Sequence, residues 1–151
     1  MILKKIFIYQ ITIILVVVIG WIQITLETFP HWLQEYKLPI QCVLLSTIGG
    51  VMYCLRAVYI ERCVKNRWNN NWEVWYFIRP ITSAISGLVA YIFLKAGLLT
   101  LEAKLLTEAN NFGFLSLSFI AGFNVSNFFK KIENIANSTF GINNSNSSKD
   151  N

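Results

Sequence analysis

The sequence predicts an all-α fold: a polytopic transmembrane four-helix bundle, with an interfacial helix between spans two and three and a C-terminal amphipathic helix. The first observation behind it is that charged residues make up 14% of the 151 residues, where about 25% is usual in soluble domains. The second is that apolar residues reach 54%. The third is that these residues gather in stretches long enough to cross about 30 Å of hydrocarbon.

The first predicted span covers residues 6–26 and contains no charged residue. Lys4 and Lys5 precede it, as basic residues do at the start of a signal peptide. The apolar run is too long for a signal peptide, however, and no small-residue cleavage site follows it. We therefore expect a span that is retained.

Two further spans begin at prolines, which suit the first turn of a helix. The second covers residues 38–59 and starts with Pro39. The third covers residues 81–101, directly after Pro80, and is interrupted by Lys95. Lys95 has three interpretations. Its long stem snorkels toward the membrane surface, its ammonium faces a lumen, where it would favour anions, or it pairs with Glu102 or Glu108.

The fourth predicted span, residues 112–129, is the most polar. Uncharged polar side chains in a membrane either hydrogen-bond between helices or line a wet surface. Together with the lysine of the third span, the candidates for lining a pore are Lys95, Ser118, Gly122, Asn124 and Asn127.

Small residues recur at a spacing of four in spans two, three and four. Such residues let helix backbones approach closely in lipid. The pattern predicts a tight bundle, formed either within one chain or between two copies of it. The predicted packing residues are Ser46, Gly50, Ser83, Gly87, Ser86, Ala90 and Ser126.

Residues 64–79 combine aromatic side chains at helical spacing with arginines, which predicts a helix at the inner membrane surface. Tryptophan and tyrosine prefer the headgroup level, and basic residues there meet anionic lipid. Base stacking is a weaker interpretation of the same pattern, because the rest of the chain offers no soluble platform; a docking surface for a cytosolic protein is the other alternative. The predicted interfacial residues are Trp68, Trp72, Trp75, Tyr76 and Arg79.

Lysine and arginine are distributed unevenly over the predicted loops. With the N-terminus inside, ten of them lie at or beyond the cytosolic ends of the spans, and only Lys37 and Lys104 lie in outer loops. This bias predicts a bacterial inner-membrane protein with both termini in the cytoplasm. Residues 1–129 would form the transmembrane domain, 130–141 an amphipathic cytosolic helix, and 142–151 a disordered polar tail.

The sequence lacks the residue patterns of common catalytic and metal sites. It has no GxSxG, no HExxH and no phosphate-binding glycine loop. The single histidine, His31, has no carboxylate cluster suited to a metal, and the three cysteines form no CxxC pair. We therefore expect no catalytic residue, no metal and no cofactor, and we do not expect an enzyme.

Two segments, RPITSAISGLVAYIFLKAGLL from Arg79 and FGFLSLSFIAGFNVSNFFKKIENIA from Phe112, resemble a pair of spans in small uncharacterised bacterial polytopic membrane proteins. In these proteins an Arg-Pro opens a glycine-bearing span, and the next span closes with Ala-Gly-Phe and an amphipathic helix. The resemblance implies four spans but no catalytic residue. The matching positions are Arg79, Pro80, Gly87, Lys95, Gly97, Gly122 and Phe123.

Three hypotheses for function follow. In all of them the protein is embedded in the lipid bilayer, and in none of them does it bind nucleic acid. In the first, the protein self-associates as a homo-oligomer that forms or gates a pore, as small membrane effectors of anti-phage defence do; this is an analogy of size and architecture. In the second, it is a membrane anchor or sensor that recruits a cytosolic protein through residues 64–79 and the C-terminal helix. The third is a phage holin.

Overall fold

A computed structural model of the protein describes residues 2–26, 31–65, 72–97 and 111–141. Every regular element in these ranges is helical, which confirms the all-α fold class. In chain order the elements are α1 (Ile2–Thr25), the 3₁₀ helix η1 (His31–Tyr36), α2 (Lys37–Tyr59), the π-helix η2 (Ile60–Val64), α3 (Glu73–Lys95), α4 (Asn111–Phe123) and α5 (Val125–Phe140).

Three of the helical stretches are long and apolar enough to cross a membrane: Leu3–Thr25, Leu33–Val64 and Glu73–Lys95. Helices α4 and α5 pass the same test only as a pair, and they are bent by 111°. The three long helices indicate a membrane protein, while a fourth crossing by the bent pair stays a prediction.

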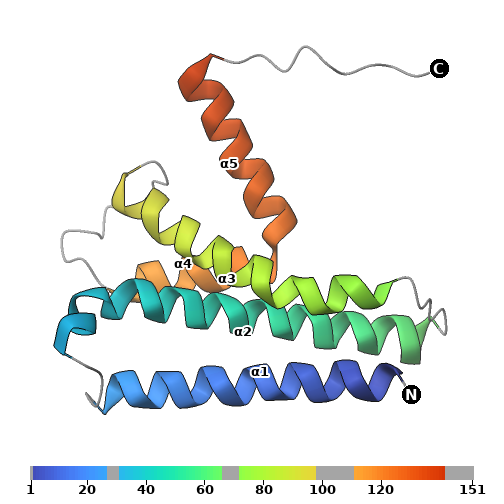
Figure 1. Cartoon of the computed structure of the whole chain (residues 1–151). Helices are drawn as coiled ribbons and strands as arrows, with labels where there is room; N and C mark the ends of the chain where they lie inside the picture. Colours follow the sequence, from blue (N-terminus) through green and yellow to red (C-terminus); the bar gives the residue numbers. More distant parts are fainter. Residues whose placement is uncertain (1, 27–30, 66–71, 98–110, 142–151) are drawn as a thin grey trace, which may run out of the picture.

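Helix α2 is the centre of the bundle, because it contacts α1, α3 and α4. Figure 1 shows α1 along one side of α2, with α3 and α4 on the other side and α5 projecting steeply away from the bundle. In α1 the buried side chains are limited to Ile6, Gln10, Val17 and Ile24. The remaining faces of α1 expose large apolar side chains, which a bilayer would cover.

Helices α2, α3 and α4 meet through small residues that bring their backbones into contact. A Cβ atom added to Gly49 would lie 2.6 Å from Phe119 O, and one added to Gly87 would lie 2.8 Å from Cys42 O. A Cβ on Gly122 would overlap the carbonyl oxygen of Ser46. Glycine is therefore required at these positions, because any larger residue would push the helices apart.

Three buried serines, Ser46, Ser83 and Ser86, join these helices by hydrogen bonds, and we call them the serine cluster. The Ser46 hydroxyl donates to Ser83 O, and Ser86 Oγ donates to Ser83 O over 2.8 Å. Ser83 Oγ lies 2.8 Å from Arg79 O and 3.1 Å from Gly122 O, so it links α3 to α4. All three side chains have no exposed surface.

Pro80 lies inside α3, seven residues after the helix begins. Proline has no N–H, so it cannot donate to the carbonyl oxygen of Tyr76, four residues earlier. Gln10 of α1 supplies the missing donor: its Nε2 lies 2.8 Å from Tyr76 O and the side chain is fully buried. The next carbonyl, that of Phe77, accepts a hydrogen bond of 3.2 Å from the Tyr9 hydroxyl.

The structure differs from the sequence prediction around residues 64–79. Residues 73–79 are the first two turns of α3, and residues 60–64 continue α2 as η2. Residues 66–71, including Trp68, lie outside the described residues. The prediction started the third span after Pro80 because proline suits the first turn of a helix. In the structure Gln10 donates to the carbonyl oxygen that Pro80 leaves without an N–H partner, and α3 runs through Pro80 without interruption.

The segment of the predicted fourth span, residues 112–129, is not one continuous helix, because the helix breaks at Asn124. This residue has φ −125° and ψ 56°, outside the helical region. The last carbonyl groups of α4 find donors on α3: Ser83 Oγ lies 3.1 Å from Gly122 O, and Arg79 Nη2 lies 3.3 Å from Phe123 O. A helix end inside an apolar environment needs such partners, and these two side chains supply them.

Helix α5 starts at Val125, five residues before the predicted amphipathic helix. It ends at Phe140, and Gly141 after it has a φ of 64°, the left-handed conformation typical of a residue that follows a helix. Phe128, Ile132 and Ile135 belong to an apolar cluster with Val89 and Phe93 of α3, among others. The predicted polar tail, 142–151, lies outside the described residues.

We predict that Gln10→Met lowers the free energy of unfolding by about 1 kcal/mol, because Tyr76 O loses its donor. The loss should be smaller in a Pro80→Ala background, where the backbone N–H of the new alanine can reach Tyr76 O. Denaturant unfolding of the four proteins in detergent measures this coupling. Thr12→Val, which removes a bond within α1 alone, is the control; equal losses with and without Pro80 would contradict the assignment.

Two glycines of α4 provide a matched pair of substitutions. Gly122→Ala places a methyl group on the Ser46 backbone, so we expect it to cost about 1–3 kcal/mol or more of stability. Gly113→Ala meets nothing within 4 Å and should be neutral or stabilising by up to about 1 kcal/mol, since alanine favours helix. Thermal unfolding in detergent compares them, and similar effects would argue against the close α2–α4 contact.

Candidate functional site at the basic end of the bundle

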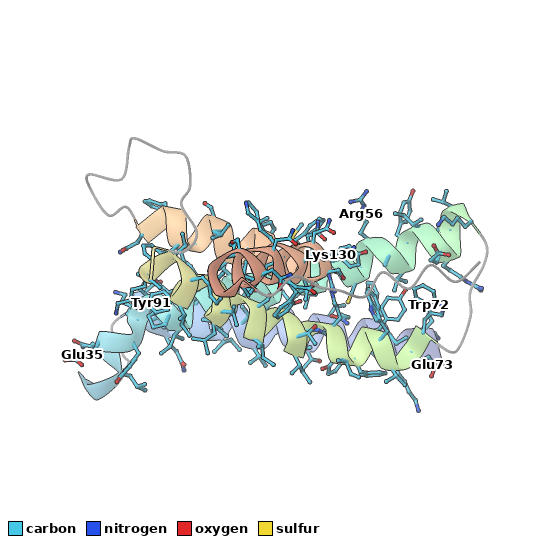
Figure 2. The ribbon with its side chains drawn as sticks, turned by 90° about the horizontal axis from the view of Figure 1, so that it is seen from above. Glu35, Arg56, Trp72, Glu73, Tyr91 and Lys130 are labelled. Carbon is cyan, nitrogen blue, oxygen red and sulfur yellow. The ribbon has the colours of Figure 1, made fainter. Side chains whose placement is uncertain are left out.

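Aromatic and charged side chains surround a cavity where α2 ends and α3 begins. Figure 2 labels Arg56 on α2 and Trp72 and Glu73 around the start of α3 at this end, while Glu35 and Tyr91 lie toward the other. The cavity has a volume of about 400 Å³. We call it the aromatic cavity; its lining residues are Tyr53, Arg56, Ala57, Ile60, Glu61, Lys65, Trp72, Trp75 and Tyr76.

The aromatic rings of the cavity pack against one another across the two helices. The ring centroids of Tyr53 and Trp75 are 5.8 Å apart, those of Trp75 and Tyr76 are 5.1 Å apart, and those of Trp72 and Trp75 are 6.3 Å apart. Edge-on and tilted pairs at these separations attract one another. Mutual packing holds Tyr53 and Trp75 in place, whereas Trp72 keeps 55% of its surface exposed.

The charges that line the cavity leave it with a net positive character. Lys65 Nζ lies 2.8 Å from Glu61 Oε1, so these two opposite charges offset each other. Arg56 adds a positive charge that is exposed. The wall that carries Glu61 is the π-helix η2, a helix type that is rare and often found at functional sites.

Arg79 lies behind the aromatic wall and is only 7% exposed. Its guanidinium carbon is 4.6 Å from the Tyr53 ring centroid and 5.4 Å from that of Trp75, which is cation–π geometry. The same guanidinium donates through Nη2 to Phe123 O, next to the break between α4 and α5. Arg79 therefore touches both the cavity wall and the last residue of α4, two residues before α5 begins.

The sequence singled out one side of this cavity and missed the other. Trp72, directly before α3, and Trp75 and Tyr76 in its first turn line the cavity. The residues that the sequence analysis missed belong to α2 and η2, and they recur at a helical spacing of three and four. They are Tyr53, Arg56, Ala57, Ile60 and Glu61. This spacing was not recognised because the residues around it are apolar, so that the whole segment was predicted to be a membrane span.

The predicted pore residues are not brought together. Ser118 and Gly122 are fully packed in the contact between α2, α3 and α4. Asn124 lies at the α4–α5 break and Asn127 in the first turn of α5, and both are exposed. Lys95 is the last residue of α3, sixteen residues beyond Arg79, or about 24 Å along the helix.

Lys95 is exposed, and its ammonium lies 5.7 Å from the ring centroid of Tyr91. Of the predicted packing residues, Ser126 is exposed on α5. The other six lie where α2, α3 and α4 meet: Ser46, Gly50, Ser83, Gly87, Ser86 and Ala90.

Comparisons with known protein families, with curated proteins and with solved structures find no match for this chain. Within the described residues, no group of three or more histidine, cysteine, aspartate or glutamate side chains is placed to hold a metal ion.

We predict that Arg79→Lys changes the position of α5, because a lysine cannot stack on two rings and reach Phe123 O at once. Spin labels on exposed Cys63 and on a Ser138→Cys variant report the distance from η2 to α5 by double electron–electron resonance. Cys42 and Cys54 are fully buried and should resist labelling. The distance distribution should broaden or shift in Arg79→Lys and stay unchanged in Arg56→Lys; an unchanged Arg79→Lys distribution would contradict the coupling.

Proposed function

We propose that the protein is a membrane-embedded docking or sensor protein, whose partner binds at the aromatic cavity and whose α5 responds. The observation that carries this proposal is the position of Arg79, which touches the cavity wall on one side and the α4–α5 break on the other. The rest of the bundle is a rigid support for these two parts.

The solid packing of α2, α3 and α4 supports a docking role over a channel through one chain. Ser83, Ser86 and Ser118 have no exposed surface. A Cβ on Gly49 or Gly122 would meet neighbouring backbone atoms. Polar groups that are packed this tightly connect helices and leave no passage for water between them.

The cavity chemistry fits a partner with an aromatic or aliphatic side chain beside an acidic group. Trp72 is exposed and packs on the ring of Trp75, and tryptophan is frequent at the centre of protein interfaces. Arg56 supplies an exposed positive charge at the same site. A group that inserts between Tyr53 and Trp75 would displace the Arg79 guanidinium. Arg79 would then no longer hydrogen-bond to Phe123 O at the end of α4.

Orientation follows from the basic residues at this end of the bundle. Lys4 and Lys5 of α1, Arg56 of α2 and Arg62 and Lys65 beyond it all belong to the same end. By the positive-inside rule this end faces the cytoplasm of a bacterial inner membrane. The proposed partner is therefore a cytosolic protein.

A photo-crosslinking amino acid at position 72 tests the docking proposal in cells. We expect it to capture a distinct protein, because Trp72 is exposed at the cavity. The same amino acid at position 16, on the exposed apolar face of α1, is the control and should capture lipid. If position 72 yields only lipid and further copies of this chain, the docking proposal is wrong.

A second candidate is a pore between several copies of the chain. It is favoured by polar side chains that point away from the bundle on α4 and α5: Ser116, Asn124 and Asn127 are all exposed. In a ring of copies these residues would line the space between the chains.

A potential-sensitive dye separates the two candidates. If the pore exists, induced expression should dissipate the membrane potential, and Asn127→Leu should reduce that effect because it removes a polar lining group. Ser138→Ala, on exposed α5 but far from the break, is the control. A potential that stays constant under strong expression would count against the pore and leave the docking proposal untouched.

A further inference from the structure

A second hollow lies on the opposite side of the same end of the bundle, between α1 and α2. Its volume is about 610 Å³, within the range of about 300–1,000 Å³ that is usual for ligand sites. The floor and walls are almost entirely apolar and include Leu3 and Phe7 of α1 with Leu55 and Val58 of α2. We call it the α1–α2 groove.

Two cations from different elements stand at the rim of this groove. Lys4 comes from α1 and Arg62 from η2, and both are exposed. None of the residues that line the groove is acidic. The groove therefore combines an apolar channel with a positively charged mouth, in contrast to the aromatic cavity, where Lys65 is already paired with Glu61.

The groove lies beside a narrow contact between α1 and the rest of the bundle. At this end α1 reaches the core through Ile6, which packs with Cys54 and Tyr76. The neighbouring side chains Phe7 and Ile8 remain 51% and 64% exposed. A molecule in the groove would cover this apolar surface and join α1 to α2 on the side that the bundle leaves open.

The shape and charge of the groove suit a phospholipid. An acyl chain is narrow and apolar, and the phosphate of an anionic lipid would lie between two cations at the headgroup level. A helix of a second copy is about 10–12 Å wide, and in a two-fold dimer Lys4 and Arg62 would face the same cations of the other chain. Charge complementarity thus favours a lipid over a second copy.

We propose that the α1–α2 groove binds an anionic phospholipid, with one acyl chain between α1 and α2 and the phosphate between Lys4 and Arg62. Basic pockets between membrane helices hold anionic headgroups in this way. The bound lipid stabilises the contact of α1 with α2 and does not depend on what occupies the aromatic cavity.

Native mass spectrometry of the full-length protein in a non-ionic detergent tests this site. The protein is titrated with phosphatidylglycerol and, separately, with phosphatidylcholine of the same acyl chains. We expect phosphatidylglycerol to bind more tightly. The double variant Lys4→Gln/Arg62→Gln should lower its affinity about 10- to 30-fold, with little change for phosphatidylcholine.

Lys130→Gln/Lys131→Gln is the matched control, because it removes the same charge from two exposed residues of α5. It should leave the affinity for phosphatidylglycerol within about twofold. Ile8→Trp, at an exposed position of the lining, fills the groove without a change of charge and should weaken binding of both lipids. Circular dichroism checks that each variant is folded.

Three results would overturn the proposal. The wild-type protein could bind both lipids equally, which would remove the role of the cations. Both double variants could lower the affinity to the same extent, which would show attraction to the basic surface in general. Finally, Lys4→Gln/Arg62→Gln could leave the affinity for phosphatidylglycerol unchanged, which would place the lipid elsewhere.

Discussion

Every carbonyl oxygen freed inside the bundle needs a hydrogen-bond donor, because lipid offers none. Within the described part of the chain, the helices free such carbonyl groups at Pro80 in α3 and at Asn124 after α4. At the first, Gln10 of α1 donates to Tyr76 O; at the second, Ser83 and Arg79 of α3 donate to the last carbonyl groups of α4. Both irregularities are therefore also connections between helices.

The need for hydrogen-bond partners also applies to Arg79, next to the aromatic cavity where the proposed partner binds. An arginine that is 7% exposed is costly unless its charge and its donors have partners. Arg79 partly meets this requirement: its guanidinium packs on the rings of Tyr53 and Trp75 and donates through Nη2 to Phe123 O, whereas its Nε has no hydrogen-bond partner among the described residues. Because these partners come from α2, α3 and α4, a change at one of them reaches the others through a single side chain.

The predicted helical class and the apolar stretches agree with the structure, whereas two predicted helix boundaries differ from it for the same reason. The apolar stretches and the helical class follow from composition and periodicity, which are local properties. The predicted helix over 64–79 and the uninterrupted span over 112–129 differ from the structure because each boundary depends on a distant donor. From the sequence, Pro80 predicts the start of a helix. In the structure Gln10 donates to the carbonyl oxygen of Tyr76, and the helix begins seven residues earlier. In the sequence, Asn124 is one of several polar residues in the fourth predicted span. The helix can end there because Arg79 donates a hydrogen bond to the carbonyl oxygen of Phe123.

By itself, the sequence determined the helical class, and it predicted four apolar segments able to cross a membrane, of which the structure shows three as long helices. It also marked the small residues at helical spacing. Only the tertiary structure decided that α3 extends back to Glu73, that α4 and α5 meet at 111°, and that Tyr53 and Arg56 join the aromatic residues of α3. The physical reason is that hydropathy and spacing are encoded along the chain, whereas the donor for a freed carbonyl is chosen by packing between segments that lie far apart in sequence.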